Sequence, residues 1–172
     1  METQTQEKNH IKTTSMNYLV THGPGKKTLE KITLRSLSTN DIDSVAQIDF
    51  SLLGKMRKEY WERKINRVVE SGVPSLAAEI DGKVIGFILG KASEREYGIP
   101  ENVGYIDTIG VSKEWQGKGI SQLLFKEMYQ ILKKIGLDTI YVFVDRKQID
   151  LVKFFDKMGF TKGDMFSMEL KI

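Results

Sequence analysis

Cysteine is absent from this 172-residue sequence, and its only two histidines, His10 and His22, both lie near the N-terminus. Without cysteine the chain has no disulfide, no thiol nucleophile and no thiolate metal ligand. From residue 23 onward it has neither residue type, which excludes Ser-His-Asp and Cys-His catalysis and the usual zinc ligand sets from the main body. The chemistry of that body therefore has to rest on other groups, and no metal is expected.

Long hydrophobic runs are missing as well. No apolar stretch approaches the roughly 20 residues that a membrane helix needs, and the N-terminus has no hydrophobic signal region. We therefore expect no membrane partner and a cytoplasmic location. The net charge of +3 is too small to indicate a nucleic acid partner, although it suits an anionic ligand such as a phosphate.

Hydropathy patterns place one domain over residues 31–172, preceded by a polar segment, residues 1–30, that we interpret as a tail or a loosely docked arm. Asp81-Gly82 separates two strand-like runs and predicts a β-hairpin. The alternation of strand and helix signals predicts a mixed sheet with helices packed on it. The expected strands are 32–36, 75–80, 83–90, 105–111, 139–144 and a closing strand 166–172, and the expected helices are 42–48, 57–69, 120–135 and 149–158.

A glycine-rich loop follows the strand that ends at Val111 and leads directly into the longest expected helix. Gly117 and Gly119 let the backbone turn and approach a ligand closely, and the first turn of a helix has free N–H groups. Such a helix entry binds phosphate or pyrophosphate, and Lys118 adds a positive charge. The loop is neither a Walker A motif nor a dinucleotide fingerprint, since the latter requires Gly or Ala where Gln122 stands. Two alternatives remain at this point, a helix entry without any ligand and a nucleotide-binding module.

The same loop resembles the signature of the GNAT N-acetyltransferase superfamily, in which Gln/Arg-x-x-Gly-x-Gly/Ala follows a hydrophobic strand. Gln116, Gly119 and Ser121 stand at the three motif positions, and Ser121 departs mildly from the usual Gly or Ala. Downstream, residues 154–160 (FFDKMGF) resemble the superfamily's Tyr-Glu-Lys-Leu-Gly-Phe ending. This resemblance implies a mostly antiparallel twisted sheet of six to seven strands flanked by about four helices.

The resemblance also implies acetyl-CoA as the acetyl donor. Its pyrophosphate would lie on the loop amides, and its pantetheine arm would pair with the preceding strand like an added strand. The helix that follows Gln148 and contains Phe155 would flank the arm from the other side. The implied cofactor-binding residues are Ile109, Gly110, Val111, Gln116, Gly117, Lys118, Gly119, Ile120, Ser121, Gln148 and Phe155.

Acetyl transfer to an amine requires a base, because a free lysine amine has a pKa of about 10.4 and must lose its proton to react. Tyr105 and Asp107 lie two residues apart in a strand and are expected on the same face of the sheet. Some members of the superfamily place a carboxylate or a tyrosine here to accept the amine proton. The alternative is an Asp107 that is capped by amides or paired with a lysine. A strand N–H near Ile109 would stabilise the oxyanion.

The usual proton donor to the leaving sulfur is missing, since Phe155 stands where many relatives have tyrosine, and Gln148 replaces an asparagine. A CoA thiolate leaves tolerably without a donor, because its pKa is near 8.5. The sequence thus predicts an N-acetyltransferase, with an acyl-CoA-binding or sensing protein of the same fold as the alternative. The amine acceptor, a small molecule or a protein amine, is left open, and so is a homodimer.

Overall fold

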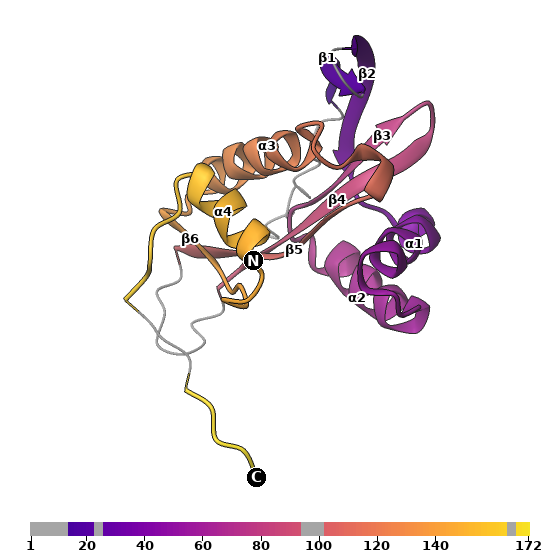
Figure 1. Ribbon diagram of the computed structural model, residues 1–172. Helices are drawn as coiled ribbons and strands as arrows, with labels where there is room; N and C mark the ends of the chain where they lie inside the picture. Colours follow the sequence, from indigo (N-terminus) through magenta and orange to yellow (C-terminus); the bar gives the residue numbers. More distant parts are fainter. Residues whose placement is uncertain (1–13, 23–25, 94–101, 165–167) are drawn as a thin grey trace, which may run out of the picture.

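The computed structural model describes residues 14–22, 26–93, 102–164 and 168–172 (Figure 1). Its strands form one six-stranded sheet in the order β1-β2-β3-β4-β5-β6, antiparallel throughout except for the parallel β5–β6 pair. The predicted fold class is thereby confirmed. The elements in chain order are β1 (Thr14–His22), β2 (Lys26–Ser36), α1 (Ile42–Leu53), α2 (Lys58–Ser71), β3 (Ser75–Ile80), β4 (Lys83–Ala92), β5 (Val103–Val111), α3 (Ile120–Lys134), β6 (Thr139–Val142) and α4 (Ile149–Lys157).

Helices cover both faces of the sheet, with α1 and α2 on one side and α3 and α4 on the other (Figure 1). The central strand β4 supplies both cores, because its successive side chains point to opposite faces. Val84, Phe87 and Leu89 pack with the α1–α2 layer, whereas Ile85 and Ile88 pack with the α3–α4 layer. A strand buried on both faces explains why the sequence of β4 is an almost unbroken apolar run.

The β3–β4 hairpin turns at Asp81-Gly82, as the sequence predicts. Asp81 has a φ of 48° and Gly82 a φ of 78°. Two positive φ angles in succession are typical of the tight turn whose twist matches antiparallel strands.

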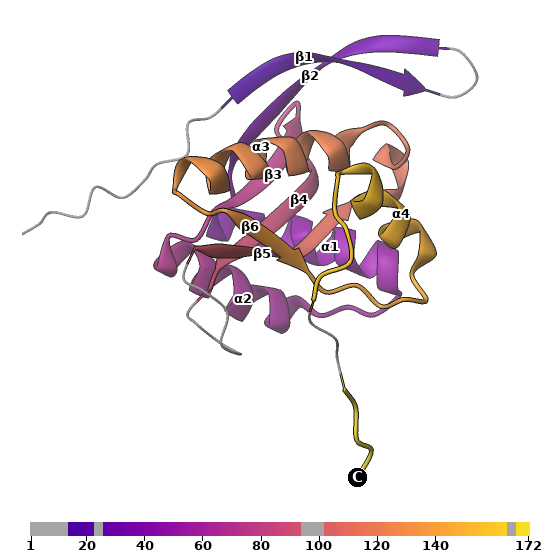
Figure 2. The same ribbon diagram turned by 90° about the vertical axis from the view of Figure 1, so that its left-hand side faces the viewer.

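Within residues 1–30, which the sequence marks as tail or arm, residues 14–22 form β1 and residues 26–30 form the start of β2. The two strands pair along the whole of β1, from Thr14 opposite Leu34 to His22 opposite Lys26. Figure 2 shows the β1–β2 hairpin above α3, and Figure 1 shows that it lies near the end of α3 where that helix begins. In the described part of the chain, no helix is both long and apolar enough to span a membrane.

The prediction of a closing strand over 166–172 is wrong for residues 168–172. Met168 to Ile172 have no regular structure, and 166–167 lie outside the described residues. The apolar side chains of Met168, Leu170 and Ile172 are 85%, 87% and 118% exposed. Alternating hydropathy forms a strand only where a neighbouring strand supplies hydrogen bonds, and none pairs with these residues here.

Candidate active site

Strands β5 and β6 separate halfway along β5. Pairing runs from Val103 opposite Thr139 to Ile106 opposite Val142, and β6 ends there. β5 continues to Val111 with β4 on its other side. Over residues 107–111, no strand in the described ranges pairs with the β6-side edge of β5, so an extended ligand has a free strand edge to pair with.

A β-bulge lies where the two strands separate. Leu89 of β4 is opposite Thr108, but the next residue, Gly90, is opposite Ile106, so Asp107 is the extra residue on β5. Bulges redirect side chains and are frequent beside active sites. Asp107 is therefore displayed at the bulge, and its side chain is 41% exposed.

Asp107 forms an ion pair with Lys64 of α2, at 2.7 Å between Oδ2 and Nζ. The Lys64 ammonium also donates a hydrogen bond to the Tyr60 hydroxyl at 2.8 Å. Burial alone would lower the pKa of Lys64, but its bonds to Asp107 and Tyr60 outweigh burial and raise that pKa. Lys64 is therefore a cation at neutral pH, and Asp107 has the lysine partner that the sequence left as an alternative.

Tyr105 lies deeper on the same strand and is 6% exposed. Its neighbour Ile106 packs in the core of the α3–α4 layer, which leaves Tyr105 and Asp107 on the opposite face, as predicted. The Tyr105 ring packs against Tyr141 and stacks on Phe143, with centroids 6.0 Å and 5.9 Å away.

The helices α1 and α2 are fastened together beside this site. Arg57 donates two hydrogen bonds to Asp49, at 2.9 Å and 2.7 Å, and its guanidinium lies 4.8 Å from the centre of the Tyr60 ring. Burial would raise the pKa of Asp49, but the hydrogen bonds from Arg57 lower it below its ordinary value. Tyr60 thus has the Arg57 guanidinium over its ring and the Lys64 ammonium at its hydroxyl, while the adjacent Trp61 lies in the core, at 1% exposure.

The glycine loop has the geometry that the sequence predicts. Gly117 and Gly119 have φ angles of 72° and 85°, and Gly119 is the N-cap of α3. The Gln116 side chain donates to the carbonyl of Val111 at 3.1 Å, which ties the loop to the end of β5. The first-turn amides of α3, including those of Ile120 and Ser121, have no partner within the helix and lie at its positive end.

Two further side chains border the loop. The Lys118 ammonium lies 4.6 Å from the centre of the Trp115 ring, and Trp115 packs half-buried on the core of the α3–α4 layer. Trp115 thus holds Lys118 beside the loop, where its charge favours an anion.

Tyr18 of β1 is a neighbour of the loop that the sequence does not reveal. A Cβ added at Gly119 would lie 2.7 Å from the Tyr18 hydroxyl oxygen. The N-terminal arm therefore reaches the helix entry, and a side chain at position 119 would have an unfavourable positive φ and would displace the Tyr18 hydroxyl.

The remaining predicted residues take different positions. Gly110 faces the α1–α2 layer, where an added Cβ would lie 2.8 Å from Phe87, whereas Ile109 packs at the edge of the other core. Gln148 is the exposed N-cap of α4. Phe155 is 3% exposed, and its ring packs edge-on against Phe154 and Phe160. Its side chain has no proton to give to a leaving group.

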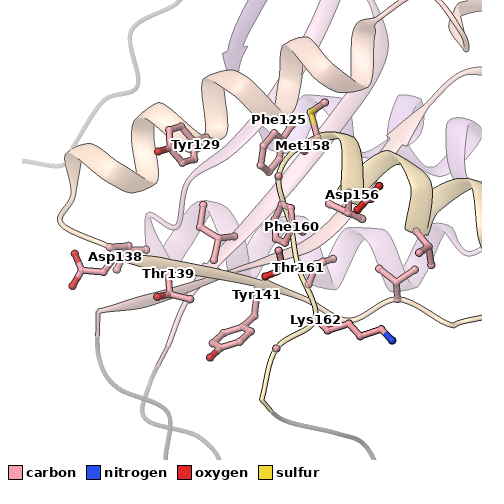
Figure 3. A pocket seen from close by; sticks show the side chains of 18 of the residues that line it. Phe125, Tyr129, Asp138, Thr139, Tyr141, Asp156, Met158, Phe160, Thr161 and Lys162 are labelled. Carbon is pink, nitrogen blue, oxygen red and sulfur yellow. The ribbon is translucent and has the colours of Figure 1, made fainter.

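A cavity of about 1060 Å³ lies elsewhere, between α3, β6, α4 and residues 160–164 (Figure 3). Tyr129, Tyr141 and Lys162 are among the side chains around it. Phe155 is the only one of the predicted site residues that lines this cavity. Because neither Asp107 nor the glycine loop borders this cavity, size alone does not make it the site of the chemistry.

A comparison with protein-family models matches residues 38–160 to the acetyltransferase (GNAT) family, and the chain belongs to that family. The resemblance inferred from the loop is thereby confirmed. Among curated proteins, a mycothiol acetyltransferase of Pseudarthrobacter chlorophenolicus is 30% identical over 90 residues, 52% of this chain and 28% of the relative. The chain thus spans less than a third of the length of the mycothiol acetyltransferases that it matches.

Solved structures share the fold over most of their length. A possible acetyltransferase from Clostridium difficile has a TM-score of 0.68 at 18% identity, covering 82% of this chain and 97% of its own. The PaiA N-acetyltransferase of Thermoplasma acidophilum, solved in complex with coenzyme A, has a TM-score of 0.62 at 23% identity, covering 78% of this chain and 92% of its own.

Proposed function

We propose that this chain transfers an acetyl group from acetyl-CoA to a primary amine by direct attack on the thioester. One observation carries the proposal: the free edge of β5 over 107–111 runs directly into the glycine loop at the start of α3. A CoA molecule needs both features in this order, a strand edge for the pantetheine amides and a cluster of N–H groups for the pyrophosphate.

The cofactor would be held mainly by backbone groups. The amides from Gly117 to Ser121 bind the pyrophosphate, and Lys118 supplies a positive charge beside it. Gln116 acts through the loop, because its side chain fixes the loop to the end of β5. The pantetheine arm pairs along Ile109, Gly110 and Val111, and the helix that begins after Gln148 and contains Phe155 flanks it from the other side.

The transfer step requires a base, an oxyanion donor and a tolerable leaving group. Asp107 accepts the proton of the incoming amine, and the neutral nitrogen attacks the thioester carbonyl. A strand N–H near Ile109 stabilises the oxyanion, the new C–N bond forms, and the C–S bond breaks. Water protonates the departing thiolate, because Phe155 has no proton to give. Tyr105 lies beside Asp107 on the same face of β5 and is the second candidate to accept the amine proton.

The alternative function is an acyl-CoA-binding or sensing protein with little turnover. The buried phenylalanine at position 155 favours it, because the phenol that many relatives use as an acid is missing. Turnover separates the two functions, whereas CoA binding alone does not.

The test measures CoA affinity by calorimetry and free CoA release with a panel of primary amines. For Asp107→Asn we expect turnover to fall by about 100-fold or more, the usual contribution of a general base, with unchanged CoA affinity. Asp43→Asn is the matched control, since Asp43 is an exposed aspartate that also pairs with a lysine of α2, Lys58. Saturable CoA binding without turnover on any amine would favour the sensing function, and an Asp107→Asn protein with wild-type turnover would place the base elsewhere.

A further inference from the structure

The surroundings of the Lys64 ammonium resemble a binding site for an alkyl ammonium ion. It has a carboxylate oxygen of Asp107 at 2.7 Å and the Tyr60 hydroxyl at 2.8 Å. The Tyr60 and Trp61 rings lie 5.2 Å and 5.7 Å from it. An anion, a hydrogen-bond acceptor and aromatic faces are the groups that recognise an organic ammonium in proteins.

This ammonium stands at the proposed base. The amine that is to be acetylated must bring its nitrogen close enough to Asp107 to give up a proton, and the Lys64 nitrogen already lies at such a distance, 2.7 Å. We propose that the Lys64 ammonium occupies the position of the acceptor amine, and that the natural acceptor is an unbranched alkylammonium that displaces it. This inference rests on the proposed function, whose acceptor it specifies.

Lys64 is suited to being displaced. Its side chain is a flexible four-carbon stem that extends from α2, so it can withdraw without a change in the helix. Asp107 is 41% exposed, which gives water and an incoming cation a route to the carboxylate. An acceptor that brings its own ammonium restores the contacts of Asp107 and Tyr60, so the carboxylate stays paired, while the released Lys64 ammonium moves into water.

The charges around the site set the class of acceptor. Asp107 attracts the cationic amine and repels a carboxylate close to it, which disfavours free α-amino acids. Arg57 is already bonded to Asp49 and lies over the face of the Tyr60 ring. The aromatic faces favour an apolar stem next to the ammonium, as in a lysine side chain or a polyamine.

The experiment truncates Lys64 and returns the missing atoms as a free amine. Propylamine, the fragment that Lys64→Ala removes, is supplied with acetyl-CoA, and CoA release is measured. We expect kcat/KM for propylamine to rise about tenfold over wild type, the factor gained when a site that is open one time in ten becomes always open. Lys58→Ala is the matched control, because Lys58 lies on the same helix and pairs with Asp43 on the surface; it should equal wild type.

Lys64→Ser is made in parallel, so that the test can be carried out if either of the two variants folds. Equal kcat/KM for propylamine in wild type and in a folded truncation would overturn the inference, while the proposed function would stand if both proteins turn over. The inference would also be overturned if the rise in kcat/KM for propylamine caused by Lys64→Ala persisted when Asp107→Asn is added. The amine would then not be bound at Asp107. If wild type does not bind CoA at all, the proposed function fails first.

Discussion

Alanine at position 119 should affect the protein in two separable ways. Both Gly119 and Gly117 have positive φ, which costs a residue with a side chain about 1–2 kcal/mol. A Cβ at Gly117 meets no atom within 4 Å, whereas one at Gly119 lies 2.7 Å from the Tyr18 hydroxyl oxygen. Gly117→Ala is therefore a matched control that has the backbone strain without the contact.

We expect Gly119→Ala to lower the free energy of unfolding by about 1 kcal/mol more than Gly117→Ala does. The difference is the cost of pushing the Tyr18 ring away from its rotamer. Each kcal/mol of lost stability lowers the melting temperature of a chain of this size by roughly 2–4 °C, so thermal melting resolves the difference between the two variants. Removing the hydroxyl with Tyr18→Phe should return most of the extra loss of stability in Gly119→Ala, because only the ring carbon at 3.3 Å then remains tight against the Cβ, and it should leave the stability of Gly117→Ala unchanged. Equal melting temperatures for the two alanine variants would refute the placement of the arm on the loop.

Two further predictions concern stability. Burial would raise the pKa of Asp41, but hydrogen bonds from Arg35 and Ser38 lower that pKa below its unfolded value of about 3.9. The ionised Asp41 carboxylate therefore stabilises the fold above a pH of about 3.9. This stabilisation is lost as the pH falls through the lower pKa of the folded state. Asp41→Asn should therefore lower the free energy of unfolding in urea by about 1.5–3 kcal/mol at neutral pH, and by progressively less as the pH falls through the folded pKa of Asp41; a pH-independent cost would contradict this. Gly110→Ala should cost about 1–3 kcal/mol in the same assay, because its Cβ would lie 2.8 Å from Phe87, and a cost near zero would show that this core adapts freely.

Local patterns allowed much of the fold to be predicted. Asp81-Gly82 determines its hairpin through two positive φ angles that few other residue pairs adopt. The conformation of the glycine loop likewise depends on the positive φ angles of Gly117 and Gly119. Such features depend on neighbours in the chain, and the structure has them at the expected positions.

Contacts between distant segments were not predictable in the same way. No pattern around Lys64 indicates that it meets Asp107, because the bulge that displays Asp107 comes from the register of β4 against β5. The contact of Tyr18 with Gly119 depends on how the β1–β2 hairpin is placed beside the start of α3. The prediction of a strand over 166–172 was wrong for a related reason. The alternation of apolar and polar residues is a local pattern, but a strand also needs a neighbouring strand to pair with.

The central claim is that the strand edge and the glycine loop together bind CoA, and a crystal structure of the protein with CoA tests it most directly. We expect pyrophosphate oxygens at about 3 Å from the amides between Gly117 and Ser121, and the pantetheine arm paired along 109–111. CoA bound instead in the cavity between β6 and α4, away from both features, would contradict the claim.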